Sequence, residues 1–231
     1  MTRLRATATR PVGPPAEIVV CIGDAAGARR GWFAPAGGPI RPGEESEVPE
    51  SALFPCRSGA SDDEMLGLLS HWPAWRVTRL ARLELGSRLL VVGGGWLAAR
   101  VLEFARLWGC VWRAASGPAD LRDRAEFWTE QADAEALRRI LPAKPDAAIL
   151  LGDSPDVIAP ALAVCQDGGT IVLAVRGGLT IDLNLYPDAH RRSLRVVGCE
   201  PLTRHAVGDA EIADGFDRIA AVLATSAMAR G

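Results

Sequence analysis

Three small residues in G-x-G-x-x-A spacing, Gly93, Gly95 and Ala98, mark the segment of this sequence best suited to binding a ligand. They follow the apolar run RLLVV, and an amphipathic helical pattern follows them. In a strand–loop–helix unit the first glycine permits a tight turn, and the second lets backbone approach a pyrophosphate at the helix N-terminus. The small third residue lets helix and strand pack closely. The pattern predicts a dinucleotide-binding loop, and its alternative is a purely structural glycine turn.

Trp96 and Leu97 occupy the last two variable positions of this loop, and we count both among the expected cofactor-binding residues. A small or short aliphatic residue is commoner than tryptophan at the first of these positions. The indole could therefore cap the cofactor, pack on a neighbouring domain or obstruct the pyrophosphate.

The second expected strand, residues 110–116, ends without the carboxylate that usually binds the ribose of NAD. Its absence removes the repulsion against the 2′-phosphate of NADP, and Ser116 with Arg122 or Arg124 could bind that phosphate. The sequence therefore favours NADP(H) over NAD(H). For each arginine taken singly, a solvated helix start is the alternative.

Further candidates follow later strands. Gly152 and Asp153 come at the end of an expected strand over 146–152, at the sheet edge where open α/β sheets bind ligands, and we expect them to border the nicotinamide. Tyr186 and His190 could face a substrate as proton donors. The alternative for these two residues is a surface linker between strands, and the catalytic residues are otherwise unknown.

Strands that alternate with helices position these residues, from about residue 85 to residue 198. This alternation predicts a doubly wound parallel sheet, that is, a Rossmann-type α/β fold. The first 60 residues are rich in proline and glycine, which fits short strands separated by turns. We therefore expect a small, partial β-rich segment over 1–60 and a dinucleotide-binding domain over 61–231. Strands are expected at 88–94, 110–116, 146–152, 168–175 and 194–198, and helices at 61–83, 97–109, 133–141 and 156–166.

Composition excludes several classes of function. The formal net charge of −2 gives no reason to expect a nucleic-acid or anionic-membrane partner. The sequence contains no run of about 18 apolar residues, so we expect no transmembrane helix. The basic N-terminus lacks the apolar segment of a secretory signal. The five cysteines never show C-x-x-C spacing and the three histidines stand apart. We therefore expect a cytoplasmic, metal-free protein with reduced thiols.

The order of these features resembles the medium-chain dehydrogenase/reductase superfamily, which includes alcohol dehydrogenases and quinone reductases. GWFAPA at 31–36, the approach to the glycine loop at 50–95, DGGTIVLAV and LRVVGCEP carry the resemblance. Most of the GroES-like catalytic domain of that family, including the stretch with its zinc ligands, has no counterpart. The resemblance thus implies a shortened, zinc-free relative. It also implies a homodimer through the last strand, because an unpaired apolar edge strand is a liability in a monomer.

Two functional hypotheses stay open. The first is a metal-independent NAD(P)-dependent oxidoreductase that transfers hydride to or from a small organic substrate. The second is a degenerate, catalytically inactive homologue that acts as a binding or accessory protein. A methyltransferase using S-adenosylmethionine shares the glycine loop but expects an acid where Ser116 stands. The sequence does not identify the substrate.

Overall fold

The computed structural model describes residues 2–12, 18–25, 28–35, 41–152, 154–174, 186–204 and 207–228. The chain divides into two compact units. The β-rich unit comprises Met1–Pro73 and Pro201–Gly231, and the parallel-sheet unit comprises Ala74–Glu200. This division differs from the expected bounds of 1–60 and 61–231, because the C-terminal helix packs on elements of the N-terminal segment.

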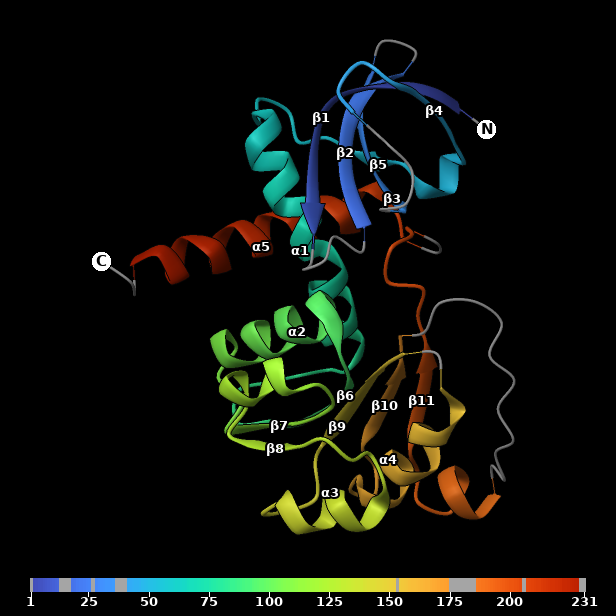
Figure 1. Ribbon diagram of the computed structural model, residues 1–231, viewed down its shortest axis with the longest axis vertical. Helices are drawn as coiled ribbons and strands as arrows, with labels where there is room; N and C mark the ends of the chain where they lie inside the picture. Colours follow the sequence, from blue (N-terminus) through green and yellow to red (C-terminus); the bar gives the residue numbers. More distant parts are fainter. Residues whose placement is uncertain are drawn as a thin grey trace. The chain divides into compact units, whose positions relative to one another are not determined.

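The β-rich unit is built on a five-stranded antiparallel sheet in the order β4-β1-β2-β3-β5 (Figure 1). Its strands are β1 (Thr2–Val12), β2 (Ile18–Ala25), β3 (Ala28–Pro35), β4 (Glu45–Val48) and β5 (Phe54–Pro55). Alternate side chains of β1 point into the core, where Leu4 and Ala6 are buried with Trp32 of β3. The expectation of a β-rich segment agrees with the sheet, but β1, with 11 residues, and β2 and β3, with 8 each, are longer than the short strands expected.

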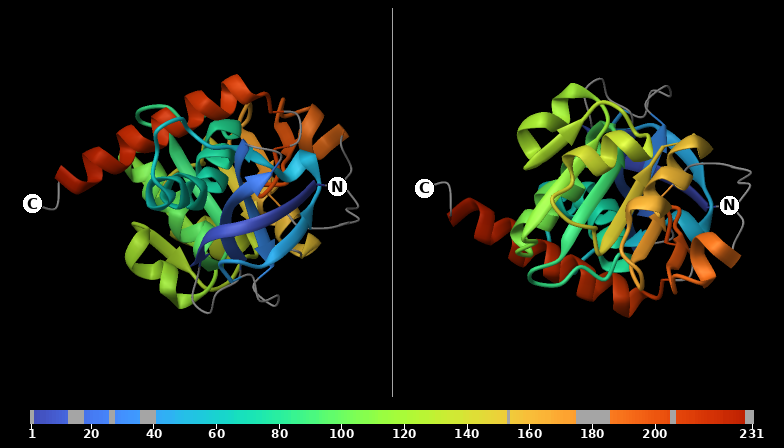
Figure 2. Two further views of the ribbon diagram at one scale, coloured as in Figure 1. Left: turned by 90° about the horizontal axis from the view of Figure 1, so that it is seen from above. Right: turned by 90° about the horizontal axis from the view of Figure 1, so that it is seen from below.

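Two long helices contribute to the β-rich unit: α1 (Asp62–Leu80), which belongs to it as far as Pro73, and α5 (Asp209–Met228), which runs as one continuous helix (Figure 2). A chain of edge-to-face aromatic contacts connects sheet and helices. The ring centroid of Phe54 of β5 lies 5.5 Å from that of Trp72 of α1. The centroid of Trp72 lies 5.7 Å from that of Phe216 of α5. These contacts explain why α5 belongs to this unit. None of the helices that the structure describes is long and apolar enough to cross a membrane.

The parallel-sheet unit holds six strands in the order β11-β10-β9-β6-β7-β8, each parallel to its neighbours (Figure 1). Numbered from β6, the order is 3-2-1-4-5-6, which is that of a dinucleotide-binding sheet. The predicted α/β fold with a Rossmann-type parallel sheet is therefore confirmed. Its strands are β6 (Arg88–Gly93), β7 (Trp112–Ser116), β8 (Phe127–Thr129), β9 (Ala147–Leu151), β10 (Thr170–Leu173) and β11 (Arg195–Gly198), and its helices include α2 (Gly95–Leu107), α3 (Ala134–Ile140) and α4 (Ile158–Val164).

The central strands of this sheet are buried on both faces, which explains their continuous apolar sequences. All five residues of β9 are buried, as are the four central residues of β6. The short edge strand β8 was not among the expected strands. It pairs three residues with the end of β7, as Ser116 pairs with Thr129.

Candidate dinucleotide-binding site

The carboxyl ends of β6 and β9 meet at the point where the strand order reverses. After β6 the chain crosses to β7 on one side, whereas β9 lies on the other side of β6. Gly93, the last residue of β6, pairs with Leu151, the last residue of β9. In open α/β sheets such a reversal opens a crevice at the carboxyl edge, and this is where nucleotides bind.

The backbone at this edge is packed so closely that only glycine fits at Gly93. Its φ is +114°, and a Cβ atom there would lie 1.6 Å from the carbonyl oxygen of Leu151. A Cβ on Gly117, in the loop after β7, would lie 2.5 Å from the carbonyl oxygen of Gly93. The loops that follow β6, β7 and β9 therefore contact one another through backbone.

The N-terminus of α2 lies directly behind this packed turn. Gly94 is the N-cap residue, with φ −134° and ψ −163°, and Gly95 begins the helix with a φ of +79°. Within the described part of the chain no side chain caps this helix, and its first turn contains no acidic residue. The first N–H groups of the helix and the positive end of its dipole are thus available to an anion.

Trp96, Leu97 and Ala98 are all buried in the first turn of α2. The indole nitrogen of Trp96 has no hydrogen-bond partner among the residues that the structure describes. An unsatisfied buried N–H costs about 1–3 kcal/mol, so a ligand oxygen at this position would be stabilising. The uncapped N-terminus of the helix fits a ligand that carries phosphate. Ala98 is fully buried, as expected for the small third residue of the loop.

Ser116 and Arg122, the expected ligands of a 2′-phosphate, have different surroundings. Ser116 is buried, and its hydroxyl donates a hydrogen bond to the carbonyl oxygen of Gln131 at 2.9 Å. Its only proton is therefore already used. Arg122 is exposed in the 3-10 helix Ala119–Arg124, and its guanidinium lies 4.4 Å from the ring centroid of Trp128. Of these two residues, the arginine is therefore the one with exposed N–H groups.

Pro118 and Trp128 connect Arg122 to the glycine loop, although sequence reasoning assigned neither of them to the site. A Cβ on Gly94 would lie 2.7 Å from the ring of Pro118. The indole of Trp128 donates to the carbonyl oxygen of Pro118 at 3.3 Å and stacks under Arg122. An aromatic residue a few positions after an arginine is the only sequence signal for this cation–π contact.

Gly152 follows β9 at the same edge as the glycine loop. It is exposed, its φ is +149°, and no atom lies within 4 Å of where a Cβ would stand. There is thus open space beside the end of β9. Asp153, its predicted neighbour in the site, lies outside the described residues.

Tyr186 and His190 lie at the amino ends of the parallel strands, whereas the glycine loop lies at their carboxyl ends. They form the first and last residues of a π-helical turn, Tyr186–His190, just before β11. Arg192, which follows the turn, pairs with Asp167 at 2.8 Å, and its carbonyl oxygen accepts from the N–H of Gly168 at 2.8 Å. Both of these partners precede β10, so the turn lies at the amino ends of the strands.

The structure therefore does not bring Tyr186 and His190 to the glycine loop. The two rings stack on each other with their centroids 5.8 Å apart, and Tyr186 is 64% exposed. The physical reason lies in the parallel topology, because a strand parallel to β10 must start at the amino edge. Residues just before β11 are consequently at that edge, which fits the alternative of a surface segment.

Ligands for a metal do not gather in the described chain, where no group of three or more His, Cys, Asp or Glu residues could hold an ion. Burial raises the pKa of the Cys21 thiol to about 12, and that of Cys165 to about 11. Both side chains are buried and neither is paired in a disulfide.

No family model matches the sequence, and no curated protein matches it. Solved structures match it over nearly the whole chain. L-idonate 5-dehydrogenase from Escherichia coli is 13% identical with a TM-score of 0.60, over 94% of this chain and 80% of that one. A proposed zinc-binding dehydrogenase from Sinorhizobium meliloti, bound to NADP, is 16% identical with a TM-score of 0.62, over 94% and 81%.

A short chain alcohol dehydrogenase from Escherichia coli complexed with NADH is 14% identical, with a TM-score of 0.62 over 93% of this chain and 81% of that one. Identities this low show a shared fold and no more. The resemblance to the medium-chain dehydrogenases is thus confirmed for the fold. Both the shortening of the chain and its independence from zinc stay predictions.

Proposed function

We propose that this protein is a metal-independent oxidoreductase that binds NADP(H) in preference to NAD(H) at the carboxyl ends of β6 and β9. Its substrate would be a small organic molecule. The uncapped N-terminus of α2 carries the proposal, because the close fit of Gly93 against Leu151 places it at the reversal of strand order. Dehydrogenases of the same fold, bound to NADP or NADH, support it.

Each part of the site has a distinct task in this proposal. The first N–H groups of α2 bind the pyrophosphate, and the indole N–H of Trp96 donates to a cofactor oxygen, which satisfies its buried donor. Arg122, held by Trp128, binds the 2′-phosphate. A bound nicotinamide supplies the hydride chemistry, so the protein mainly positions the cofactor and excludes water.

The experiment is a calorimetric titration of the full-length protein with NADPH and NADH. We expect binding of both, and a Trp96→Phe variant, which keeps an aromatic ring but loses the N–H, should bind NADPH about tenfold more weakly. Trp108→Phe is the matched control, because Trp108 lies at the other end of α2 and should leave the affinity unchanged. Thermal melting checks that both variants fold.

Three results would count against the proposal. If neither nucleotide binds, or if Gly95→Val leaves binding intact, the glycine loop is not the cofactor site. Near one zinc per chain in protein purified without chelator would contradict metal independence.

A binding or accessory role is the second candidate function, and one observation favours it. Tyr186 and His190, two of the proton donors that the sequence suggested, lie at the amino ends of the strands, away from the glycine loop. NADPH that binds but is not oxidised by any of a panel of aldehydes, ketones and quinones would support this role over that of an enzyme.

A further inference from the structure

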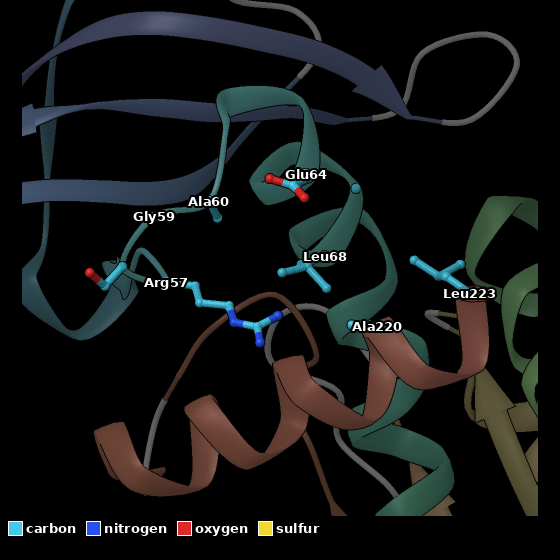
Figure 3. A pocket seen from close by; sticks show the side chains of 9 residues that line it. Arg57, Gly59, Ala60, Glu64, Leu68, Ala220 and Leu223 are labelled. Carbon is cyan, nitrogen blue, oxygen red and sulfur yellow. The ribbon is translucent and has the colours of Figure 1, made fainter. Parts of the chain in front are cut away.

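A cavity of about 490 Å³ opens within the β-rich unit, between the turn after β5, the start of α1 and the C-terminal half of α5 (Figure 3). Its volume falls in the range of small-molecule pockets, about 300–1,000 Å³. The proposed cofactor chemistry makes no use of it.

One wall of this cavity is apolar and the other is charged. Leu68 of α1 and Ala220 and Leu223 of α5 form the apolar wall. Arg57 extends from the turn after β5 into the space between the two helices, and Glu64 lies at the start of α1 (Figure 3). An elongated ligand with one polar end would match this division.

A second cavity, of about 370 Å³, continues along the same face of α5, and Arg57 lines both cavities. Apart from the consecutive Phe216 and Asp217, the α5 residues that line them recur at three- or four-residue intervals, as neighbours on one helix face do. They are Asp209, Ala213, Phe216, Asp217, Ala220 and Leu223. We call the two cavities together the α5 groove.

The charges of the α5 groove decide where an acidic group can bind. Arg57 pairs with Asp217 at 3.2 Å, but the two side chains are 52% and 64% exposed, so the pair is weak and leaves other guanidinium N–H groups free. Asp217 also lines the second cavity, and its carboxylate disfavours an anion there, whereas Asp209 is paired with Arg204. An acidic head is therefore best placed at Arg57, on the side of the first cavity.

Glu64 limits the negative charge that a ligand of the first cavity can carry. It forms a capping box with Ser61, whose backbone N–H donates to the carboxylate at 2.8 Å and whose hydroxyl accepts from the N–H of Glu64 at 3.2 Å. The hydrogen bond from the Ser61 backbone holds the pKa of the Glu64 carboxyl below its usual range. Glu64 stays ionised at neutral pH and repels a second anionic group.

We propose that the α5 groove binds a small aliphatic monocarboxylate. The carboxylate accepts hydrogen bonds from the Arg57 guanidinium, and the chain lies against Leu68, Ala220 and Leu223. A single guanidinium next to carboxylates suits a singly charged head and disfavours a phosphate dianion. The site lies wholly in the β-rich unit and does not depend on the proposed cofactor function.

The test compares three probes of one chain length on the full-length protein by ligand-observed NMR and calorimetry. Octanoate should bind about tenfold more tightly than octanol, because its hydrogen bond to arginine is charge-assisted. Octylamine should bind at least as weakly as octanol. Equal affinities for octanoate and octylamine, or no binding of octanoate, would overturn the proposal.

Variants separate the head from the tail. Arg57→Gln should reduce octanoate affinity to that of octanol and leave octanol binding unchanged. Asp217→Asn should strengthen octanoate binding several-fold, because it removes the competing carboxylate. Leu223→Ser should weaken both probes.

Arg218→Gln is the matched control, since Arg218 lies on the same helix in an exposed ion pair with Asp214. If Arg57→Gln binds octanoate as the unmodified protein does, the guanidinium is not the anchor and the proposal is wrong. The gain expected for Asp217→Asn is a second measurement of opposite sign, which a general loss of folding cannot mimic.

Discussion

Among single residues, we propose that Arg122 decides between the two nicotinamide cofactors. The hydroxyl of Ser116 donates to Gln131, and the loop after β7 instead holds an exposed guanidinium against the Trp128 ring. Stacking on the ring restricts the arginine side chain while its N–H groups stay free for a phosphate.

Arg122→Gln should therefore weaken NADPH binding about tenfold and change NADH binding less than about twofold, because only NADPH carries the 2′-phosphate. Arg138→Gln, at an exposed position of α3, is the control and should alter neither affinity. Calorimetric titrations of the three proteins measure the effect. Equal losses for both nucleotides would show that Arg122 does not contact the 2′-phosphate.

At the scale of elements, one ionic network joins the amino ends of the central strands. The guanidinium of Arg88 donates to both carboxylate oxygens of Asp146, at 2.9 and 2.7 Å, and to the side-chain oxygen of Gln166 at 2.5 Å. The backbone N–H of Arg88 donates to Asp146 as well, at 2.8 Å. These bonds connect the start of β6 with the residues that precede β9 and β10.

Asp146→Asn should lower the free energy of unfolding by about 2 kcal/mol at pH 7, because it removes charge-assisted hydrogen bonds that are partly shielded from water. The hydrogen bonds from Arg88 hold the pKa of the Asp146 carboxyl below its usual range. The stabilisation is complete above the ordinary aspartate pKa of about 4 and is lost as pH falls through the lowered value.

Urea unfolding of both proteins at pH 7 and at pH 3 measures this difference, which should shrink in acid. Asp167→Asn is the control, because Asp167 pairs with Arg192 but is 68% exposed, and its loss should cost less. A difference between Asp146→Asn and the unmodified protein that is as large at pH 3 as at pH 7 would contradict this account.

At the scale of the whole molecule, the free edge of β11 predicts self-association. Among the strands that the structure describes, β11 ends the parallel sheet and pairs only with β10. The N–H groups of Arg195 and Cys199 bond to the β10 side, so alternation along the strand directs those of Val196 and Gly198 outward. A second copy could pair with this edge across a two-fold axis and continue the sheet.

We therefore predict a homodimer by light scattering at micromolar concentration. Gly198→Pro should give a monomer, because it removes an outward donor at an exposed position where no atom lies within 4 Å of a Cβ. Gly208→Pro, at an exposed glycine of the β-rich unit, should leave the dimer intact. A monomer mass for the unmodified protein in the same measurement would contradict the prediction.

Features that depend on local pattern could be predicted from the amino-acid sequence. The apolar runs of β6, β9 and β10 are buried on one or both faces, and the glycine loop sits between a strand and a helix, so period and spacing were enough to predict them. The α/β fold class followed from their alternation. The strand β8 was not predicted, because its three residues are too few to show the two-residue alternation of a strand.

Contacts between distant residues, in contrast, could not be predicted and depend on the packing of the folded chain. Strand order puts Gly93 beside Leu151, and parallel pairing puts Tyr186 at the edge away from the glycine loop. The contact of Trp72 with Phe216 joins segments far apart in sequence, and so does the pairing of Arg57 with Asp217. The physical reason is that periodicity records which face of an element is buried, whereas the partner on that face depends on how distant parts of the chain pack.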